Sequence, residues 1–168
     1  TREFLQHQIM DVHPTNWETR SSATGHYHGY TNVSVPSYLP NMEPHVVNYY
    51  DDYAIPGIPY TPSGYSTKLK GLPTATKVRV LGATEKWLWT VYCYDDFGRV
   101  VRTWSQHNLE GTDITDNTYN FAGELTASNR RHYVNGTEKL YVANVHTYDH
   151  VGRPRDTRQK TGDNSATT

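Results

Sequence analysis

One short turn motif recurs in this chain, and its recurrence constrains the fold more than any other feature of the sequence. The first copy is Tyr94-Asp95-Asp96-Phe97-Gly98-Arg99-Val100. It lies between two runs rich in aromatic and β-branched residues, 87–93 and 100–104, and such runs are typical of β-strands. The Asp95 side chain can accept hydrogen bonds from backbone amides just ahead of it, and Gly98 can adopt a positive φ. The segment therefore predicts a β-hairpin with a bulge beside the turn.

Two further copies follow along the chain. They are Tyr119-Asn120-Phe121-Ala122-Gly123-Glu124-Leu125 and Tyr148-Asp149-His150-Val151-Gly152-Arg153-Pro154. A self-similar unit at intervals of about 20–50 residues indicates a repeat array. The positions that define the motif are Tyr94, Asp95, Gly98 and Arg99 in the first copy, Tyr119, Asn120 and Gly123 in the second, and Tyr148, Asp149, Gly152 and Arg153 in the third.

The acidic and basic positions of the motif are expected to pair across each turn. Arg99 and Arg153 each follow their aspartate by four residues. In the middle copy both positions change together, to Asn120 and Glu124. This joint change indicates a coupled pair, and it suggests that the motif acids and bases stabilise turns rather than form an active site.

The composition supports a broad β-sheet. Only 35% of the residues are hydrophobic, yet the chain holds 14 Tyr and 4 Trp, and the mean hydropathy is −0.79. Many Tyr and Thr residues with few Leu residues suit twisted sheets with half-solvated faces better than a helical bundle. The formal charge of −1 argues against non-specific nucleic-acid binding, which requires a concentrated positive surface.

We therefore predict a mainly β chain, an antiparallel meander of at least six strands, with a largely irregular N-terminal part and a short helix or turn over 1–13. Asn135-Gly136 predicts a type I′ turn. Further strands are expected over 26–35 and 46–53. The strands of the array are expected over 76–81, 86–94, 99–106, 114–121, 124–134, 139–148 and 153–160.

Composition along the chain predicts four segments. Residues 1–58 form an N-terminal segment that holds the helix and a degenerate motif copy, Tyr50-Asp51-Asp52-Tyr53, without a glycine in register. Residues 59–75 form a Pro- and Gly-rich loop, 76–160 form the hairpin array, and 161–168 form a polar tail. The chain opens without an apolar leader run and is interpreted as a fragment of a longer protein. No apolar run approaches the roughly 20 residues of a membrane span.

The pattern Tyr-Asp-x-x-Gly-Arg resembles the motif of the RHS/YD-repeat family. The segment 94–100 matches it fully, 148–154 departs only at Pro154, and 119–125 keeps the Tyr, Gly and Leu. Residues 28–32 and 48–53 are similar to segments that precede the repeats in large bacterial RHS proteins. The resemblance implies a bacterial cell-surface or secreted protein in which repeated hairpins build a hollow shell. In several relatives the shell encloses a C-terminal toxin, and related repeats in animal teneurins mediate cell contact.

The resemblance also implies the partners. These are the remaining repeats of the full-length protein, a C-terminal toxin domain, or a glycan or protein on a cell surface. An exposed strand at the end of the array is expected to form a dimer through the sheet edge, or to aggregate.

No pattern in the sequence supports catalysis or a cofactor. Cys93 lies in a strand without a helix N-terminus to lower its pKa, so we interpret it as a buried structural thiol. His26 and His28 lack a third ligand, and we predict no metal site. The paired acids at 51–52 and 95–96, and Asp113 with Asp116, are assigned to turns and loops.

The leading hypothesis for the function is a non-catalytic structural segment, and the aromatic residues support an alternative to it. Exposed rings on a sheet face can bind sugars or protein partners, and a carbohydrate- or protein-binding module is the second hypothesis. If these rings instead fill a packed face of the sheet, the leading hypothesis of a non-catalytic structural segment is favoured. The candidate ligand-contact residues are Trp87, Trp89, Trp104, Tyr92 and Tyr141.

Overall fold

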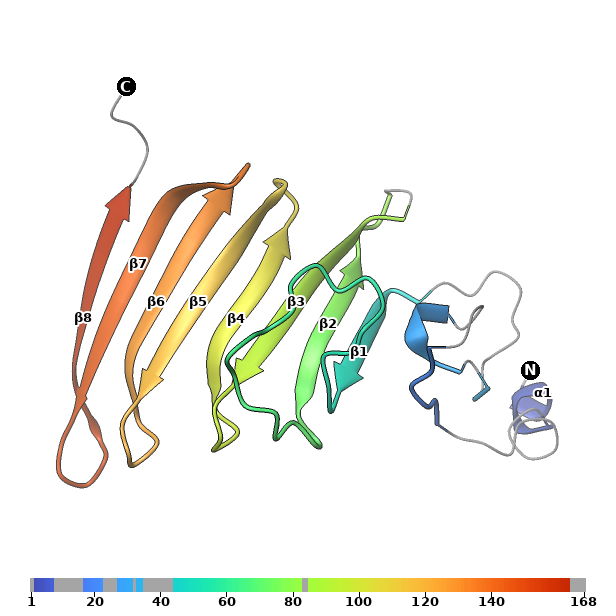
Figure 1. Cartoon of the computed structure of the whole chain (residues 1–168), viewed down its shortest axis with the longest axis horizontal. Coiled ribbons are helices and arrows are strands. Elements are labelled where there is room, and N and C mark those ends of the chain that lie inside the picture. Colours follow the sequence, from blue (N-terminus) through green and yellow to red (C-terminus); the bar gives the residue numbers. More distant parts are fainter. Residues whose placement is uncertain are drawn as a thin grey trace.

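The chain forms one eight-stranded antiparallel sheet whose strands follow one another in sequence order (Figure 1). This computed structural model describes residues 2–7, 17–22, 27–31, 33–34, 44–82 and 85–163. The prediction of a mainly β meander is confirmed. The strands are β1 (Val46–Tyr50), β2 (Pro73–Arg79), β3 (Trp87–Tyr94), β4 (Val100–His107), β5 (Gly111–Tyr119), β6 (Leu125–Val134), β7 (Thr137–Tyr148) and β8 (Pro154–Asp163).

The three motif copies form the turns between β3 and β4, β5 and β6, and β7 and β8, and these turns lie in a row at one end of the sheet (Figure 1). At the opposite end, β6 and β7 are joined by the predicted type I′ turn. Asn135 and Gly136 have φ values of 50° and 74°, and Val134 pairs with Thr137 directly across the turn. Positive φ at both central residues defines this turn type.

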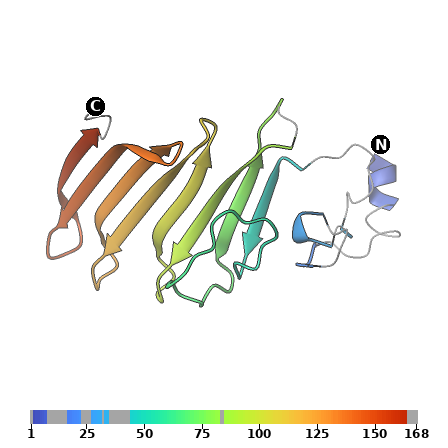
Figure 2. The same ribbon diagram turned by 45° about the horizontal axis from the view of Figure 1, so that its top comes forward.

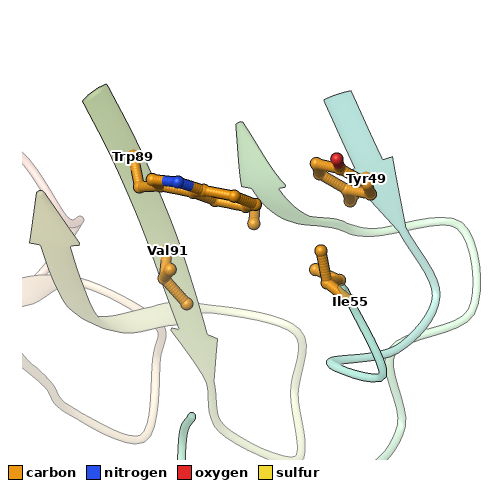
Figure 3. Close-up of a cluster of buried hydrophobic side chains, with 5 residues drawn as sticks. Tyr49, Ile55, Trp89 and Val91 are labelled. Atoms are coloured by element: carbon orange, nitrogen blue, oxygen red, sulfur yellow. The ribbon is translucent and has the colours of Figure 1, made fainter. Parts of the chain in front are cut away.

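The buried core lies at the β1–β4 end of the sheet. The segment 51–72, between β1 and β2, crosses over one face of β2 and β3 (Figure 1). Its residue Ile55 packs against Tyr49, Trp89 and Val91, which extend from β1 and β3 toward it (Figure 3). Tyr60 of the same segment stacks on Trp104 of β4, with ring centroids 5.6 Å apart. This crossing segment therefore forms a second layer over the first half of the sheet.

No described segment forms such a layer over the second half of the sheet. Beyond Tyr94, none of the described residues is buried, and the strands extend as a single twisted ribbon (Figure 2). Polar pairs connect neighbouring strands in place of a core. On the face that carries Trp104, Asp116 of β5 binds both Arg102 of β4 and Arg131 of β6. Cross-strand pairs of this kind stabilise a sheet without burial of apolar side chains.

The N-terminal part confirms one prediction and corrects another. The helix α1 covers Arg2–His7, within the predicted range 1–13, and the other residues of that range lie outside the described residues. The strand expected over 26–35 is wrong for its described part, because Tyr27–Gly29 form a 3-10 turn, η2. His28 has a φ of 56°, which interrupts any strand. Tyr30 makes only an isolated bridge to Arg20.

Side chains nevertheless connect this N-terminal part to β1. Tyr30 donates a hydrogen bond to the Asn48 carbonyl at 2.6 Å, and the Tyr49 phenol donates to the His28 carbonyl at 2.9 Å. Among the described residues, no helix is long and apolar enough to cross a membrane.

The sheet crosses the boundaries of the segments that the sequence predicts. β1 belongs to the segment 1–58, yet it pairs with β2 over five residue pairs. β2 begins at Pro73 instead of residue 76, and β8 continues to Asp163 instead of ending at residue 160. The loop predicted over 59–75 thus connects two neighbouring strands of one sheet. Residues 164–168 of the predicted tail lie outside the described residues.

Candidate functional site: the motif turns and the ladder between hairpins

The first motif turn is closed by one aspartate. The Asp95 carboxylate accepts hydrogen bonds from the amides of Phe97 and Arg99, both at 3.0 Å. The Gly98 amide bonds the Asp95 carbonyl, and the Asp95 amide bonds the Arg99 carbonyl. The Arg99 guanidinium then binds the same carboxylate, with Nε 2.7 Å from Oδ2. The amides of Asp95, Phe97, Gly98 and Arg99 are thereby all hydrogen-bonded within the motif.

The third turn repeats these contacts atom for atom. Asp149 accepts bonds from the amides of Val151 and Arg153 at 3.0 Å, and Arg153 Nε lies 2.7 Å from its Oδ2. In the middle turn Asn120 accepts the amides of Ala122 and Glu124 through Oδ1. Its side-chain amide donates to the Glu124 carboxylate. The predicted coupled pair is therefore present in both forms, as aspartate with arginine and as asparagine with glutamate.

Each motif glycine allows its turn to close into a bulged hairpin. The φ values of Gly98, Gly123 and Gly152 are 76°, 87° and 80°, a region that other residues adopt only at a cost. Each pairing shifts by one residue just before the motif tyrosine, so Tyr94 faces Val100 and Tyr119 faces Leu125. The bulge predicted from the sequence is confirmed.

The motif tyrosines connect each hairpin to the preceding one. The Tyr119 phenol donates to the Val100 carbonyl at 3.1 Å, and the Tyr148 phenol donates to the Leu125 carbonyl at 2.9 Å. In both cases the acceptor is the first residue of the second strand of the preceding hairpin. These contacts form a ladder of phenols along the end of the sheet that carries the motif turns.

Arginine makes the link in the other direction. Arg99 donates from Nη1 to the Asn120 carbonyl in the next turn at 3.0 Å, and its guanidinium lies 5.0 Å from the centre of the Tyr119 ring. The corresponding Arg153 lies in the hairpin of β7 and β8, and no described strand follows β8 in the sheet. Its side chain is 75% exposed, against 25% for Arg99.

The hairpin of β1 and β2 is a fourth unit whose turn carries a long insertion. The Asp51 amide bonds the Leu72 carbonyl, as the Asp95 amide bonds the Arg99 carbonyl, and Gly71 has a φ of 81°. The Tyr94 phenol donates to the carbonyl of Pro73, the first residue of β2, at 2.6 Å, so the ladder begins here. The glycine missing from the degenerate copy is thus Gly71, beyond the segment that packs on the sheet. The sequence signal was Tyr50-Asp51 followed, after the insertion, by Gly71-Leu72-Pro73.

The turn carboxylates are held in their ionised form. Burial alone would raise the pKa of Asp95, but hydrogen bonds from the Arg99 side chain and the turn amides outweigh this effect and lower it. Hydrogen bonds from the backbone and side chain of Arg153 lower the pKa of Asp149 in the same way. Such shifts belong to structural ion pairs as well as to catalytic groups. The groups that lower the pKa of Asp95 and Asp149 belong to the same turns as the two carboxylates.

The five candidate aromatic residues do not form one exposed platform. Trp89 is 8% exposed and belongs to the core, against which Trp87 and Trp104 also pack. Tyr92 lies on the opposite face, because side chains alternate along β3. Tyr141 of β7 lies over Gly162, where an added Cβ would approach its ring to 2.0 Å. Of the five residues, Trp89 therefore fits best the interpretation that the rings fill a packed face of the sheet.

Cys93 is fully buried. Burial raises the pKa of its thiol to about 11, so the thiol is protonated at neutral pH and is a poor nucleophile. Of the predicted histidine pair, His26 lies outside the described residues. His28 Nδ1 lies 2.8 Å from Lys77 Nζ, and burial, with the charge of Lys77, lowers its pKa to about 4.

Sequence reasoning missed one cluster of ligand-type side chains. His107, Asp113 and His132 come from three neighbouring strands and place potential metal-ligand atoms within 4.8 Å of one another. Their sequence separations follow no metal-binding motif, so only the strand register brings them together. Asp113 lies in β5 and pairs with His132 of β6, instead of lying in the loop predicted from the sequence.

Comparisons of the chain with protein-family models, with curated proteins and with solved structures found no match.

Proposed function

We propose that this chain is a non-catalytic structural segment of a hairpin-array protein of the RHS/YD-repeat kind. The observation that carries the proposal is the repeated set of contacts between successive hairpins. A tyrosine in each of the last three hairpins binds the preceding unit, and Arg99 binds the following turn. Contacts that recur at equivalent positions suit a modular array, in which each unit contacts its neighbours.

The open edge at β8 supports a further hairpin as the first partner. Residues 154–161 of β8 are exposed, and an unpaired strand edge is a template for another strand. Arg153 retains the donor that Arg99 uses to reach the next turn. The expected partner is the next repeat of the full-length protein, and a second copy of this chain can occupy the same edge as a dimer.

The uncovered second half of the sheet supports the role of a shell or scaffold. No segment covers either face from β5 to β8 within the described part of the chain. A shell of this kind would enclose a toxin domain or contact a neighbouring cell. The place of action would then be the bacterial cell surface or the extracellular space, as the resemblance implies.

The alternative, a sugar- or protein-binding module with an aromatic platform, has less support. The tryptophans that it requires pack against the core, and Tyr92 lies on the other face of the sheet. Glycan-array screening tests this alternative. Reproducible sugar binding that Trp87→Ala abolishes would favour it over the structural role.

Light scattering across a concentration series tests the structural proposal. The 19.2 kDa chain is expected to associate as its concentration rises, because the β8 edge is open. The variant Arg153→Gln should weaken the association more than the matched control Arg155→Gln. A strictly monomeric mass at high concentration would contradict the proposed edge pairing.

A further inference from the structure

A cluster on the sheet face opposite the crossing segment carries chemistry that the hairpin array does not need. His107 ends β4, Asp113 lies in β5 and His132 lies in β6. Asp113 pairs with Ser105 on one side and with His132 on the other. His107 pairs with Gly111, two residues before Asp113 along β5. Because alternate residues share a face, the three side chains converge on one side of the sheet.

Gly111 makes this convergence possible. A Cβ at this position would lie 2.5 Å from both Cε1 and Nε2 of His107. The imidazole of His107 therefore lies over the glycine and stacks on the His132 ring, with centroids 4.5 Å apart and planes inclined by 18°. Any larger residue at 111 would displace the ring.

We propose that His107, Asp113 and His132 form a binding site for one divalent transition-metal ion of the Zn²⁺ and Co²⁺ class. Two imidazoles and one carboxylate are a ligand set that such ions favour. The three ligand atoms lie within 4.8 Å of one another. Tetrahedral coordination at ordinary Zn–N and Zn–O lengths needs about 3.3 Å between ligand atoms. Binding would therefore draw the more distant ligand atoms together and separate Asp113 Oδ1 from His132 Nδ1, which lie 2.7 Å apart.

The hydrogen bonds around the cluster show what a metal ion would replace. Asp113 Oδ1 lies 2.7 Å from His132 Nδ1, too close for an ion between them, so the hydrogen shared there must move when a metal binds. His107 lies 3.0 Å from the Tyr133 carbonyl through Nε2 and accepts the Leu109 amide through Nδ1. Coordination through Nδ1 would displace the Leu109 amide and leave the Nε2 hydrogen donated to the Tyr133 carbonyl, which would orient the ring. Coordination through Nε2 would move the ring hydrogen to Nδ1 and remove both contacts.

A charged side chain, that of Arg130, contacts the carboxylate of Asp113. Arg130 Nη2 lies 2.8 Å from Asp113 Oδ2 and orients the carboxylate. Its positive charge opposes the binding of a metal cation nearby. The cluster is also accessible, because His132 lines a hollow of about 250 Å³ together with Arg130, Leu140 and Val142.

Isothermal titration of the whole chain with ZnCl₂ and with CoCl₂ tests the proposal. One ion per chain is expected to bind. The visible absorption spectrum of the Co²⁺ complex, measured separately, should indicate coordination of low symmetry. Asp113→Asn and His132→Gln should each weaken binding by about 10- to 100-fold or more. The control His150→Gln, at an exposed turn position, should leave binding unchanged. Arg130→Gln should strengthen it, because a competing positive charge is removed.

Three outcomes would overturn the proposal. The first is an absence of saturable binding by the wild-type chain. The second is binding that the cluster variants retain at full strength, which would indicate adventitious surface histidines. The third is a loss of binding in the control variant equal to the loss in the cluster variants. Circular dichroism melts of each variant without metal show whether a loss of binding reflects unfolding. If His132→Gln unfolds, Asp113→Asn, which retains the side-chain volume, decides the question.

Discussion

The guanidinium of Arg99 donates a hydrogen bond to the Asn120 carbonyl at 3.0 Å and so connects one motif turn to the next. The same guanidinium binds Asp95 in its own turn. One side chain therefore stabilises its own hairpin and fixes the position of the neighbouring hairpin. This double role explains why an arginine suits a position that is four residues past the turn aspartate.

Replacement of Asp95 and Arg99 by Asn and Glu, the residue types of the middle turn, tests the coupling across the turn. Arg99→Glu alone places two carboxylates together and should destabilise the chain, and Asp95→Asn alone should also destabilise it. The double variant should recover about 0.5–3 kcal/mol relative to the sum of the single effects, since Asn120 and Glu124 already pair in this geometry. Urea denaturation measures all four free energies of unfolding. Simple additivity would contradict a coupled pair.

Removal of single phenol hydroxyls tests the ladder between hairpins. Tyr119→Phe and Tyr148→Phe each delete one donor and should cost about 1 kcal/mol of stability. The matched control is Tyr50→Phe in β1, which no hairpin precedes in the described sheet and whose side chain is 45% exposed. Thermal melts of the three variants provide the comparison. Equal melting temperatures for all three would show that the hydroxyls do not stabilise the array.

Much of the fold could be predicted because the turn chemistry is local. Asp95, Gly98 and Asn135 act within a few residues, so their conformations follow from the residue types. The alternation of polar and apolar residues then places the strands between these turns. For the same reason, the pairing of Arg99 with Asp95 could be predicted from their separation of four residues across a turn.

Features that depend on register could not be predicted. The cluster of His107, Asp113 and His132 depends on the alignment of three strands, and no spacing in the sequence specifies it. Gly71 lies too far along the chain from Asp51 to be recognised as its turn partner. An insertion that packs on the sheet separates these two residues, and only the three-dimensional fold brings them together.

Gly111→Ala, at a packed strand position, should lower the free energy of unfolding more than Gly136→Ala, at a turn position. A Cβ at Gly111 would lie 1.9 Å from the Tyr133 carbonyl oxygen, so Gly111→Ala forces the backbone of two strands apart. We expect a loss of at least about 1–3 kcal/mol. Gly136→Ala meets no atom within 4 Å but retains a φ of 74°, so its cost should be about 1 kcal/mol. Chemical denaturation ranks the two variants, and the reverse order would be inconsistent with the observed packing.

Acid should release the contacts that Glu18 makes in the N-terminal part. Its carboxylate accepts bonds from the Ser34 amide and hydroxyl at 2.7 and 2.6 Å and from the Thr31 hydroxyl at 2.7 Å. Burial raises the pKa of Glu18, but these hydrogen bonds outweigh the effect and lower it from 4.5 to about 2. A lowered carboxylate pKa contributes stability that is present above 4.5 and is lost as the pH falls toward 2.

The Ser34 amide resonance in an NMR titration reports this protonation. Its chemical shift should change with a midpoint near 2, and Glu18→Gln should abolish the transition. A midpoint near 4.5, the ordinary value, would mean that the carboxylate does not hold these donors in solution.

The outer edge of β8 pairs with no strand in the described part of the chain, and this open edge is central to the proposed function. Hydrogen–deuterium exchange at low and high protein concentration tests it most directly. The β8 amides that point away from β7 should exchange rapidly in dilute solution and become protected as the chains associate, while the amides of β5 and β6 stay protected throughout. If β8 exchanges equally fast at every concentration, the edge does not pair and the proposed array does not extend from it.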